Sequence, residues 1–167
     1  RIGIGINTGE CVVGNMGSDK RFDYSVLGDP VNLAARLEGQ SKNYGVDIVI
    51  GEETQKTMND WATIELDLIA VKGKAEAVRI FALLGNEEYK QKSEFNKLYE
   101  ANSEMLIAYR KKEWDKAEKL IDETKKLAEH VNIEIETLNM LYKDRIKEYR
   151  QNPPPDNWDG VFVATSK

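Results

Sequence analysis

Two polar residues, Asn32 and Arg36, have the types and the spacing to bind a phosphorylated ligand. They lie four residues apart in FDYSVLGDPVNLAAR (22–36), so a helix here would carry both on one face. Asp29 suits the N-cap of this helix and Pro30 its first position. The start of a helix favours anions, because its first N–H groups lack partners and its dipole is positive there. The segment therefore predicts a cradle for a phosphorylated ligand.

The elements around this helix follow from the pattern of apolar and turn residues. The helix itself is predicted over about 30–43, with Gly45 ending it and with Val31, Ala34, Ala35 and Leu37 buried. Before it we expect a strand at the chain start, where isoleucines alternate, a second strand over 10–15 and a polar loop over 17–23. After it we expect a strand over 46–50, a helix over 52–59 and strands over 64–71 and 78–84. Interspersed strands and helices indicate an α/β fold, an α+β sandwich of one sheet covered by helices.

A more specific pattern runs through RIGIGINTGECVVGNMGSDKRFDYSVLGDPVNLAARLE (1–38) and the later VKGK (71–74). A strand ending in Thr8-Gly9 is followed by the Gly14 and Gly17 turn, by Gly28-Asp29 and by VNLAAR. With these features in this order, residues 1–84 resemble the C-terminal half of a class III adenylyl/guanylyl cyclase catalytic domain. The resemblance implies part of a ferredoxin-like palm. The strands that should pair with the first strand are absent, so we expect an unpaired edge there.

The resemblance also implies an activity and site residues. Class III cyclases convert a nucleoside triphosphate into a 3′,5′-cyclic monophosphate and pyrophosphate, as lyases in signal transduction. Arg36 matches the arginine that stabilises charge on the α-phosphate, and Asn32 the residue that positions the ribose. Ser25 lies where the family reads the purine, and Lys72 matches the lysine that contacts the terminal phosphates. A serine hydroxyl can donate or accept a hydrogen bond, so Ser25 leaves GTP open, while the resemblance favours ATP, that is, an adenylate cyclase.

The cofactors and partners follow from the same resemblance. The family uses two divalent ions, Mg²⁺ or Mn²⁺, whose two aspartate ligands lie on segments N-terminal to this stretch, so we assign no metal ligand here. Its active site forms across a head-to-tail dimer, so we expect a second cyclase chain as partner and no activity from these 167 residues alone. A non-catalytic, cyclase-like regulatory or protein-interaction module is the alternative. The chain begins at Arg1 within a strand pattern, so we expect it to be part of a longer polypeptide.

Composition narrows the classes of partner. The net charge of -5 argues against nucleic acid as the main partner. Cys11 is the single cysteine, so no intrachain disulfide can form, and we expect it to be buried. No apolar run approaches the roughly 20 residues that span a bilayer. We expect a cytoplasmic location for the chain.

The remainder of the chain predicts a helical extension. No Gly or Pro occurs over 87–151, and helical periodicity predicts helices over about 87–110, 113–130 and 133–150. YEANSEMLIAY followed by KKEWDKAEKLIDET resembles one tetratricopeptide-type hairpin, which must pack on the cyclase region, the third helix or another chain. Three prolines then precede DNWDGVFVATSK, whose apolar residues should dock onto folded surface. Such an end resembles bacterial sensor cyclases, which implies a parent anchored in the inner membrane. We therefore predict three parts: 1–86, 87–151 and 152–167.

Overall fold

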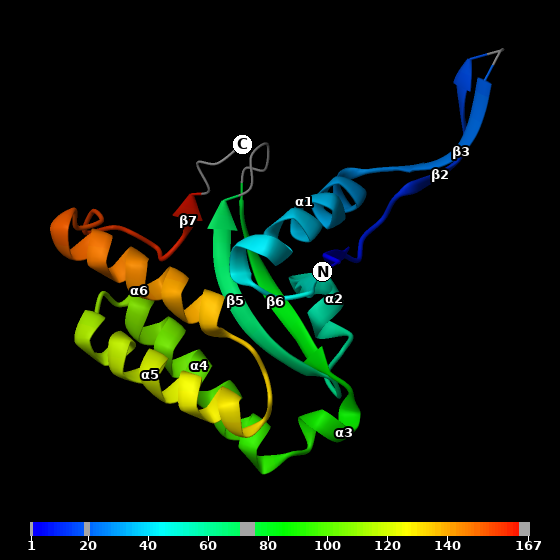
Figure 1. Ribbon diagram of the computed structural model, residues 1–167. Helices are drawn as coiled ribbons and strands as arrows, with labels where there is room; N and C mark the ends of the chain where they lie inside the picture. Colours follow the sequence, from blue (N-terminus) through cyan, green and yellow to red (C-terminus); the bar gives the residue numbers. More distant parts are fainter. Residues whose placement is uncertain (1, 19–20, 71–75, 164–167) are drawn as a thin grey trace.

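The computed structural model describes residues 2–18, 21–70 and 76–163. Six helices and seven strands follow one another along these residues (Figure 1). The first part holds β1 (Ile4–Ile6), β2 (Val12–Ser18), β3 (Arg21–Leu27), α1 (Asp29–Tyr44), β4 (Ile48–Gly51), α2 (Glu52–Lys56), β5 (Ala62–Ala70) and β6 (Ala77–Gly85). The second part holds α3 (Glu87–Lys90), α4 (Ser93–Arg110), α5 (Trp114–His130), α6 (Glu136–Gln151) and β7 (Phe162–Val163).

The main sheet has five strands in the order β1-β4-β6-β5-β7. Strands β1 and β4 are parallel and are joined through α1, while β4, β6 and β5 are antiparallel neighbours. Helices α1 and α2 lie to the right of β5 and β6 in Figure 1, and α4, α5 and α6 lie to their left. This mixed sheet covered by helices confirms the predicted α/β sandwich.

Strand β1 forms one edge of the sheet. It pairs with β4 through Ile4 and Ile48, and within the described part of the chain no other strand pairs with it. Ile2, Ile4 and Ile6 are all exposed. The expected unpaired edge at the first strand is therefore present, and it displays apolar side chains to solvent.

Strands β2 and β3 form a separate two-stranded ribbon, so the polar loop predicted over 17–23 is wrong. The ribbon pairs Val12 with Leu27 at its base and Ser18 with Arg21 at its tip, and it extends away from the rest of the molecule (Figure 1). Within the described part of the chain neither face of the ribbon is covered by another layer, so its sequence need not alternate between apolar and polar residues. The same lack of cover leaves Cys11 exposed, contrary to the expected burial.

The helical region also differs from its predicted boundaries. The single helix predicted over 87–110 is two helices, α3 and α4, separated by Gln91 and Lys92. The break lets the ring of Tyr89 meet that of Phe95 edge to face, with 6.0 Å between centroids. No Gly or Pro marks the position, so the sequence carries no local signal for the end of the first helix.

The two regions share one continuous core. Buried residues of α1 and the sheet, such as Leu37 and Ile64, belong to the same apolar cluster as Leu98, Ile121 and Ile146 of the last three long helices. The α4–α5 hairpin therefore buries its apolar face against both the sheet and α6. None of the described helices is both long and apolar enough to cross a membrane.

The last described residues lie against this core. Trp158 packs on the rings of Tyr109 and Tyr149, with centroid distances of 5.5 Å and 5.3 Å. Strand β7 then pairs in parallel with the end of β5, where Phe162 lies opposite Ile69.

Candidate functional site

Helix α1 has one buried face and one exposed face. Leu33, Leu37, Ser41 and Tyr44 are buried against the sheet, so the buried stripe predicted from Val31, Ala34, Ala35 and Leu37 is wrong except at Leu37. Ala35 is exposed. The buried positions recur every three or four residues from Leu33, which leaves the other face of the helix to solvent.

Asn32 and Arg36 lie on that exposed face. Both side chains are exposed, and neither makes a hydrogen bond or an ion pair to any described residue. Arg36 is therefore not a surface arginine paired with Asp29 or Glu38. An arginine fork and a carboxamide, about one helical turn apart and without internal partners, remain available to a ligand or to another chain.

The start of α1 differs from the predicted cap. Gly28 is the N-cap residue, with φ 149°, and Asp29 is the first residue of the helix, so the predicted Asp29 cap is wrong. A glycine is suited to this positive φ, because a residue with a Cβ atom rarely adopts it. The N–H groups of Val31 and Asn32 donate to the carbonyl of Gly28. Asp29 instead places a carboxylate in the first turn, where the helix dipole favours it.

The two remaining predicted residues lie on hairpins. Ser25 is half-buried on β3, where it pairs with Gly14 of β2, three residues before the N-cap of α1. Lys72 lies outside the described residues, between the end of β5 at Ala70 and the start of β6 at Ala77. The structure thus places Ser25, Asn32 and Arg36 along one stretch of chain that runs from the ribbon into α1.

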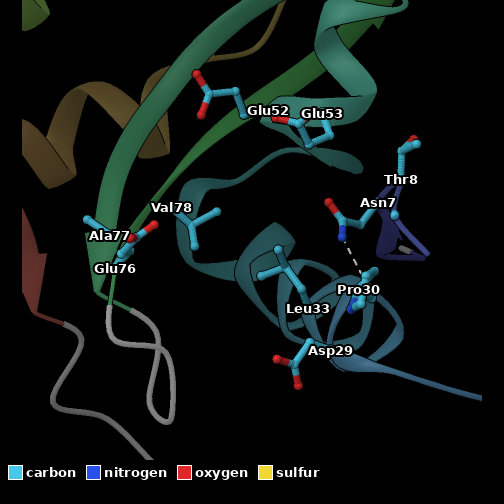
Figure 2. A pocket seen from close by; sticks show the side chains of 11 residues that line it. Asn7, Thr8, Asp29, Pro30, Leu33, Glu52, Glu53, Glu76, Ala77 and Val78 are labelled. Carbon is cyan, nitrogen blue, oxygen red and sulfur yellow. Dashed lines mark hydrogen bonds between the residues drawn. The ribbon is translucent and has the colours of Figure 1, made fainter. Parts of the chain in front are cut away.

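A pocket of about 590 Å³ lies at the start of α1 (Figure 2). Residues after β1, at the start of α1, after β4 and at the start of β6 line it; they are Asn7, Thr8, Gly9, Asp29, Pro30, Leu33, Glu52, Glu53, Glu76, Ala77 and Val78. The amide of Asn7 donates to the carbonyl of Pro30 at 3.1 Å, and the hydroxyls of Thr8 and Thr54 lie 2.9 Å apart. These bonds tie the residues after β1 to α1 and α2.

The pocket and the exposed pair are separate features. Ser25, Asn32 and Arg36 do not line the pocket, and its carboxylates, Asp29, Glu52, Glu53 and Glu76, would repel a triphosphate. Among the described residues, no group of three or more His, Cys, Asp or Glu side chains could hold a metal ion. The described residues therefore do not fit the two-metal site that the cyclase resemblance implies.

Sequence reasoning did not identify this pocket. Part of the signal lies in the sequence, since polar residues directly follow two strands, Asn7-Thr8 after β1 and Glu52-Glu53 after β4; the structure adds that these two strands are parallel neighbours. The carboxyl ends of parallel strands meet at one edge of a sheet, and ligand crevices form there. Recognising it required knowledge that the two strands are neighbours.

Comparison with known proteins bears on the first half of the chain. The family model described as "Adenylate and Guanylate cyclase catalytic domain" matches residues 1–85. The adenylate cyclase of Anabaena cylindrica is 42% identical over 84 residues, which cover 48% of this chain and 17% of that protein. "Adenylate cyclase 1" of Rhizobium meliloti is 35% identical over 86 residues, which cover 51% of this chain and 13% of that protein.

A solved structure matches about half of the chain. The adenylyl cyclase CyaB from P. aeruginosa is 39% identical, with a TM-score of 0.44, and the match covers 49% of this chain and 41% of that one. The chain spans less than a fifth of the length of the curated relatives named above.

Proposed function

Because the chain belongs to the adenylate and guanylate cyclase catalytic domain family, we propose that it supplies the nucleotide-reading half of an adenylate cyclase. The enzyme converts ATP into 3′,5′-cyclic AMP and pyrophosphate. The observation that carries the proposal is the exposed pair Asn32 and Arg36 on α1, whose side chains have no partners among the described residues. An unpaired, permanently charged fork beside a carboxamide suits a ligand with a ribose and phosphates.

In the proposed reaction the ribose 3′ hydroxyl loses its proton to solvent and its oxygen bonds to the α-phosphorus, while the bond from that phosphorus to the bridging oxygen of pyrophosphate breaks. Negative charge grows on the α-phosphoryl oxygens and on the leaving group. The guanidinium of Arg36 stabilises this charge, and Asn32 holds the ribose so that its 3′ oxygen lies in line with the bond that breaks. Both roles depend on position, which the rigid helix α1 provides.

Ser25 and Lys72 complete the proposed contacts with the nucleotide. Ser25 reads the purine edge through its hydroxyl, and Lys72 contacts the terminal phosphates as a mobile point charge. The location of Ser25 on β3, three residues before the N-cap of α1, supports a base contact next to the ribose contact.

A second cyclase chain is the proposed partner. The ribbon of β2 and β3 exposes Val12, Val13, Tyr24, Val26 and Leu27. Val12 and Leu27 pair on one face, and Val13 and Val26 on the other, so both faces carry uncovered apolar side chains. An isolated two-stranded ribbon is marginally stable in water, so a partner that covers it would stabilise it. We assign that role to a second copy of the longer polypeptide, whose metal-binding segments would bring their carboxylates to Asn32 and Arg36.

The experiment compares this chain with a longer polypeptide that contains it together with the family's metal-binding segments. Each is incubated with ATP, and separately with GTP, in the presence of Mg²⁺ or Mn²⁺, and cyclic nucleotide is measured. We expect cyclic AMP from the longer polypeptide and none from the 167-residue chain. Cyclic AMP from the chain alone would refute the half-site assignment, cyclic GMP would refute the choice of ATP, and no product from the longer polypeptide would favour a non-catalytic module.

A further inference from the structure

The end of α1 far from Asn32 is held by a buried polar network. Tyr44, the last residue of the helix, is 1% exposed, and its hydroxyl donates to Oδ2 of Asp67 on β5 at 2.7 Å. The other carboxylate oxygen of Asp67 accepts the N–H of Leu68 at 2.8 Å. Asp67 follows a shift in the pairing register between Glu65 and itself, an irregularity of the kind that re-aims side chains.

The third member of the network comes from the helical extension. Arg145 of α6 donates to Oδ2 of Asp67 at 2.6 Å and to the hydroxyl of Tyr44 at 3.3 Å. Arg145 is 8% exposed and Asp67 1%. One buried carboxylate thus joins the catalytic helix, the sheet and the extension, and each of its oxygens has a hydrogen-bond donor.

Two further contacts close the arrangement. The ring of Phe162 on β7 lies over the guanidinium of Arg145, with 3.4 Å between the guanidinium carbon and the ring centroid. Gly45, the C-cap of α1, has φ 71° and lies against Thr137 of α6 so closely that an added Cβ would come within 2.4 Å of the Thr137 Cβ. The start of α6 and the end of α1 are therefore in direct contact.

The charge state of the network agrees with this geometry. Burial alone would lower the pKa of Arg145, but the carboxylate of Asp67 and nearby tyrosines leave it raised overall. Burial, together with the charge of Asp67, raises the pKa of Tyr44 well above its ordinary value. The arginine stays charged and the tyrosine stays a donor over the whole physiological range. A buried ion pair is sensitive to the loss of one partner, because the other is then left uncompensated.

We propose that Arg145 is a positioning residue: through Asp67 and Tyr44 it couples the helical extension and the strand β7 to α1, and so sets the placement of Asn32 and Arg36. The coupling stands on the structure alone, whereas its effect on catalysis rests on the proposed cyclase function. A change in the extension, such as undocking of Phe162, would then alter the catalytic helix without touching the nucleotide. Catalysis is sensitive to displacements of about 1 Å in groups that position a substrate.

Hydrogen exchange of the 167-residue chain tests the coupling without any activity. Arg145→Met removes the fork, and Asp67→Asn with Arg145→Met removes both charges, so the second variant avoids an unpaired buried carboxylate. In both variants we expect the amides at the end of α1 (residues 40–46) to exchange at least tenfold faster than in the unaltered chain, with little change in the exchange of β5 and β6. Arg150→Met is the matched control, since it removes an exposed arginine of the same helix that pairs with Asp115 and Glu118. It should leave α1 unchanged.

An equal rise of exchange in α1 and in the sheet, or loss of cooperative unfolding in both test variants, would show a general stability role and overturn the proposal. The catalytic consequence is measured in the longer polypeptide. There Arg145→Met should lower kcat at least tenfold and change KM for ATP less than twofold, with partial recovery by Arg145→Lys. Unchanged kcat in an active enzyme would also overturn the proposal. If the unaltered polypeptide makes no cyclic nucleotide, the proposed function fails, and hydrogen exchange still decides the coupling.

Discussion

The exposed pair on α1 is the feature on which the functional assignment depends at the scale of single residues. Asn32 and Arg36 have no partners among the described residues, although the molecule pairs other arginines, such as Arg110 with Glu65 and Arg150 with Asp115. Arg110 and Arg150 each hold a carboxylate of another element, whereas the guanidinium of Arg36 is exposed and makes no such contact to a described residue. Arg36 therefore stabilises no contact with the described residues, and its role in binding the nucleotide is a prediction.

The corresponding prediction concerns Arg36→Ala in the longer, active polypeptide. Removal of one group that stabilises transition-state charge typically costs about 10²–10³ in kcat, so we expect a loss of this size with a much smaller change in KM. Arg36→Lys should recover little, because a point charge does not reproduce the planar fork. Lys42→Ala, on the exposed surface of the same helix, is the control in the same steady-state assay. Equal losses in binding and turnover would indicate a structural role for Arg36.

A second residue-scale prediction follows from the buried tyrosines. Burial raises the pKa of Tyr44, Tyr109 and Tyr142 well above the ordinary value of 10.0. The folded state therefore keeps these protons above pH 10 while the unfolded state releases them, so stability is full below pH 10 and falls as pH rises. The expected slope is about 1.4 kcal/mol per pH unit for each tyrosine.

Urea unfolding at pH 8, 10 and 11 measures this slope. Tyr44→Phe should make the slope shallower by one tyrosine's share, whereas Tyr24→Phe, at a ring that is 77% exposed, should not change it. A slope that is identical in all three proteins would contradict the assigned burial effect.

At the scale of elements, the β2–β3 ribbon carries the proposal of a second chain. It projects from the molecule with apolar side chains on both faces, whereas the same kinds of residue on β5 and β6 are buried between the sheet and the helices (Figure 1). Uncovered apolar surface of this kind marks a site of association.

We therefore predict that Val26→Lys weakens self-association of the longer polypeptide. A charge placed in a desolvated contact typically costs several kcal/mol, which corresponds to a loss of at least 100-fold in the association constant by sedimentation. Thermal stability of the 167-residue chain should change little, because Val26 is 42% exposed in it. Ile107→Lys, at an exposed residue of α4, is the control. Undiminished association of the Val26 variant would assign the interface to another surface.

At the scale of the whole molecule, the helical extension and the region that matches the cyclase family are packed together. The core runs without interruption from Leu37 of α1 to Ile146 of α6, and the chain end adds Trp158 to a cluster of aromatic rings on α4, α5 and α6. Displacement of the end should therefore affect the stability of the whole chain.

Trp158→Ala tests this connection. The ring is only partly buried, so we expect a loss of about 2–3 kcal/mol in the free energy of unfolding, below the roughly 3–5 kcal/mol of a fully buried aromatic side chain. Chemical denaturation followed by circular dichroism measures it as one cooperative transition. Trp61→Ala, at an exposed residue outside the cluster, is the control. Two separate transitions in the variant would show that the two regions unfold independently.

The sequence by itself determined the class of fold, the family and the approximate positions of most elements. Local signals were sufficient for α1, β4, β5 and β6, because apolar periodicity and turn glycines act over a few residues. The family pattern likewise lies in a contiguous stretch, so Ser25, Asn32 and Arg36 could be proposed without coordinates. Their roles remain predictions.

Only the tertiary structure decided which elements meet. Local sequence did not predict the ribbon of β2 and β3 or the break between α3 and α4. It also gave no sign of the network of Tyr44, Asp67 and Arg145. Asp67 and Arg145 are 78 residues apart, and each reads as an ordinary surface charge until burial removes it from water. Contacts of this kind depend on the packing of distant segments, because burial and pairing arise from the whole fold and not from local propensity.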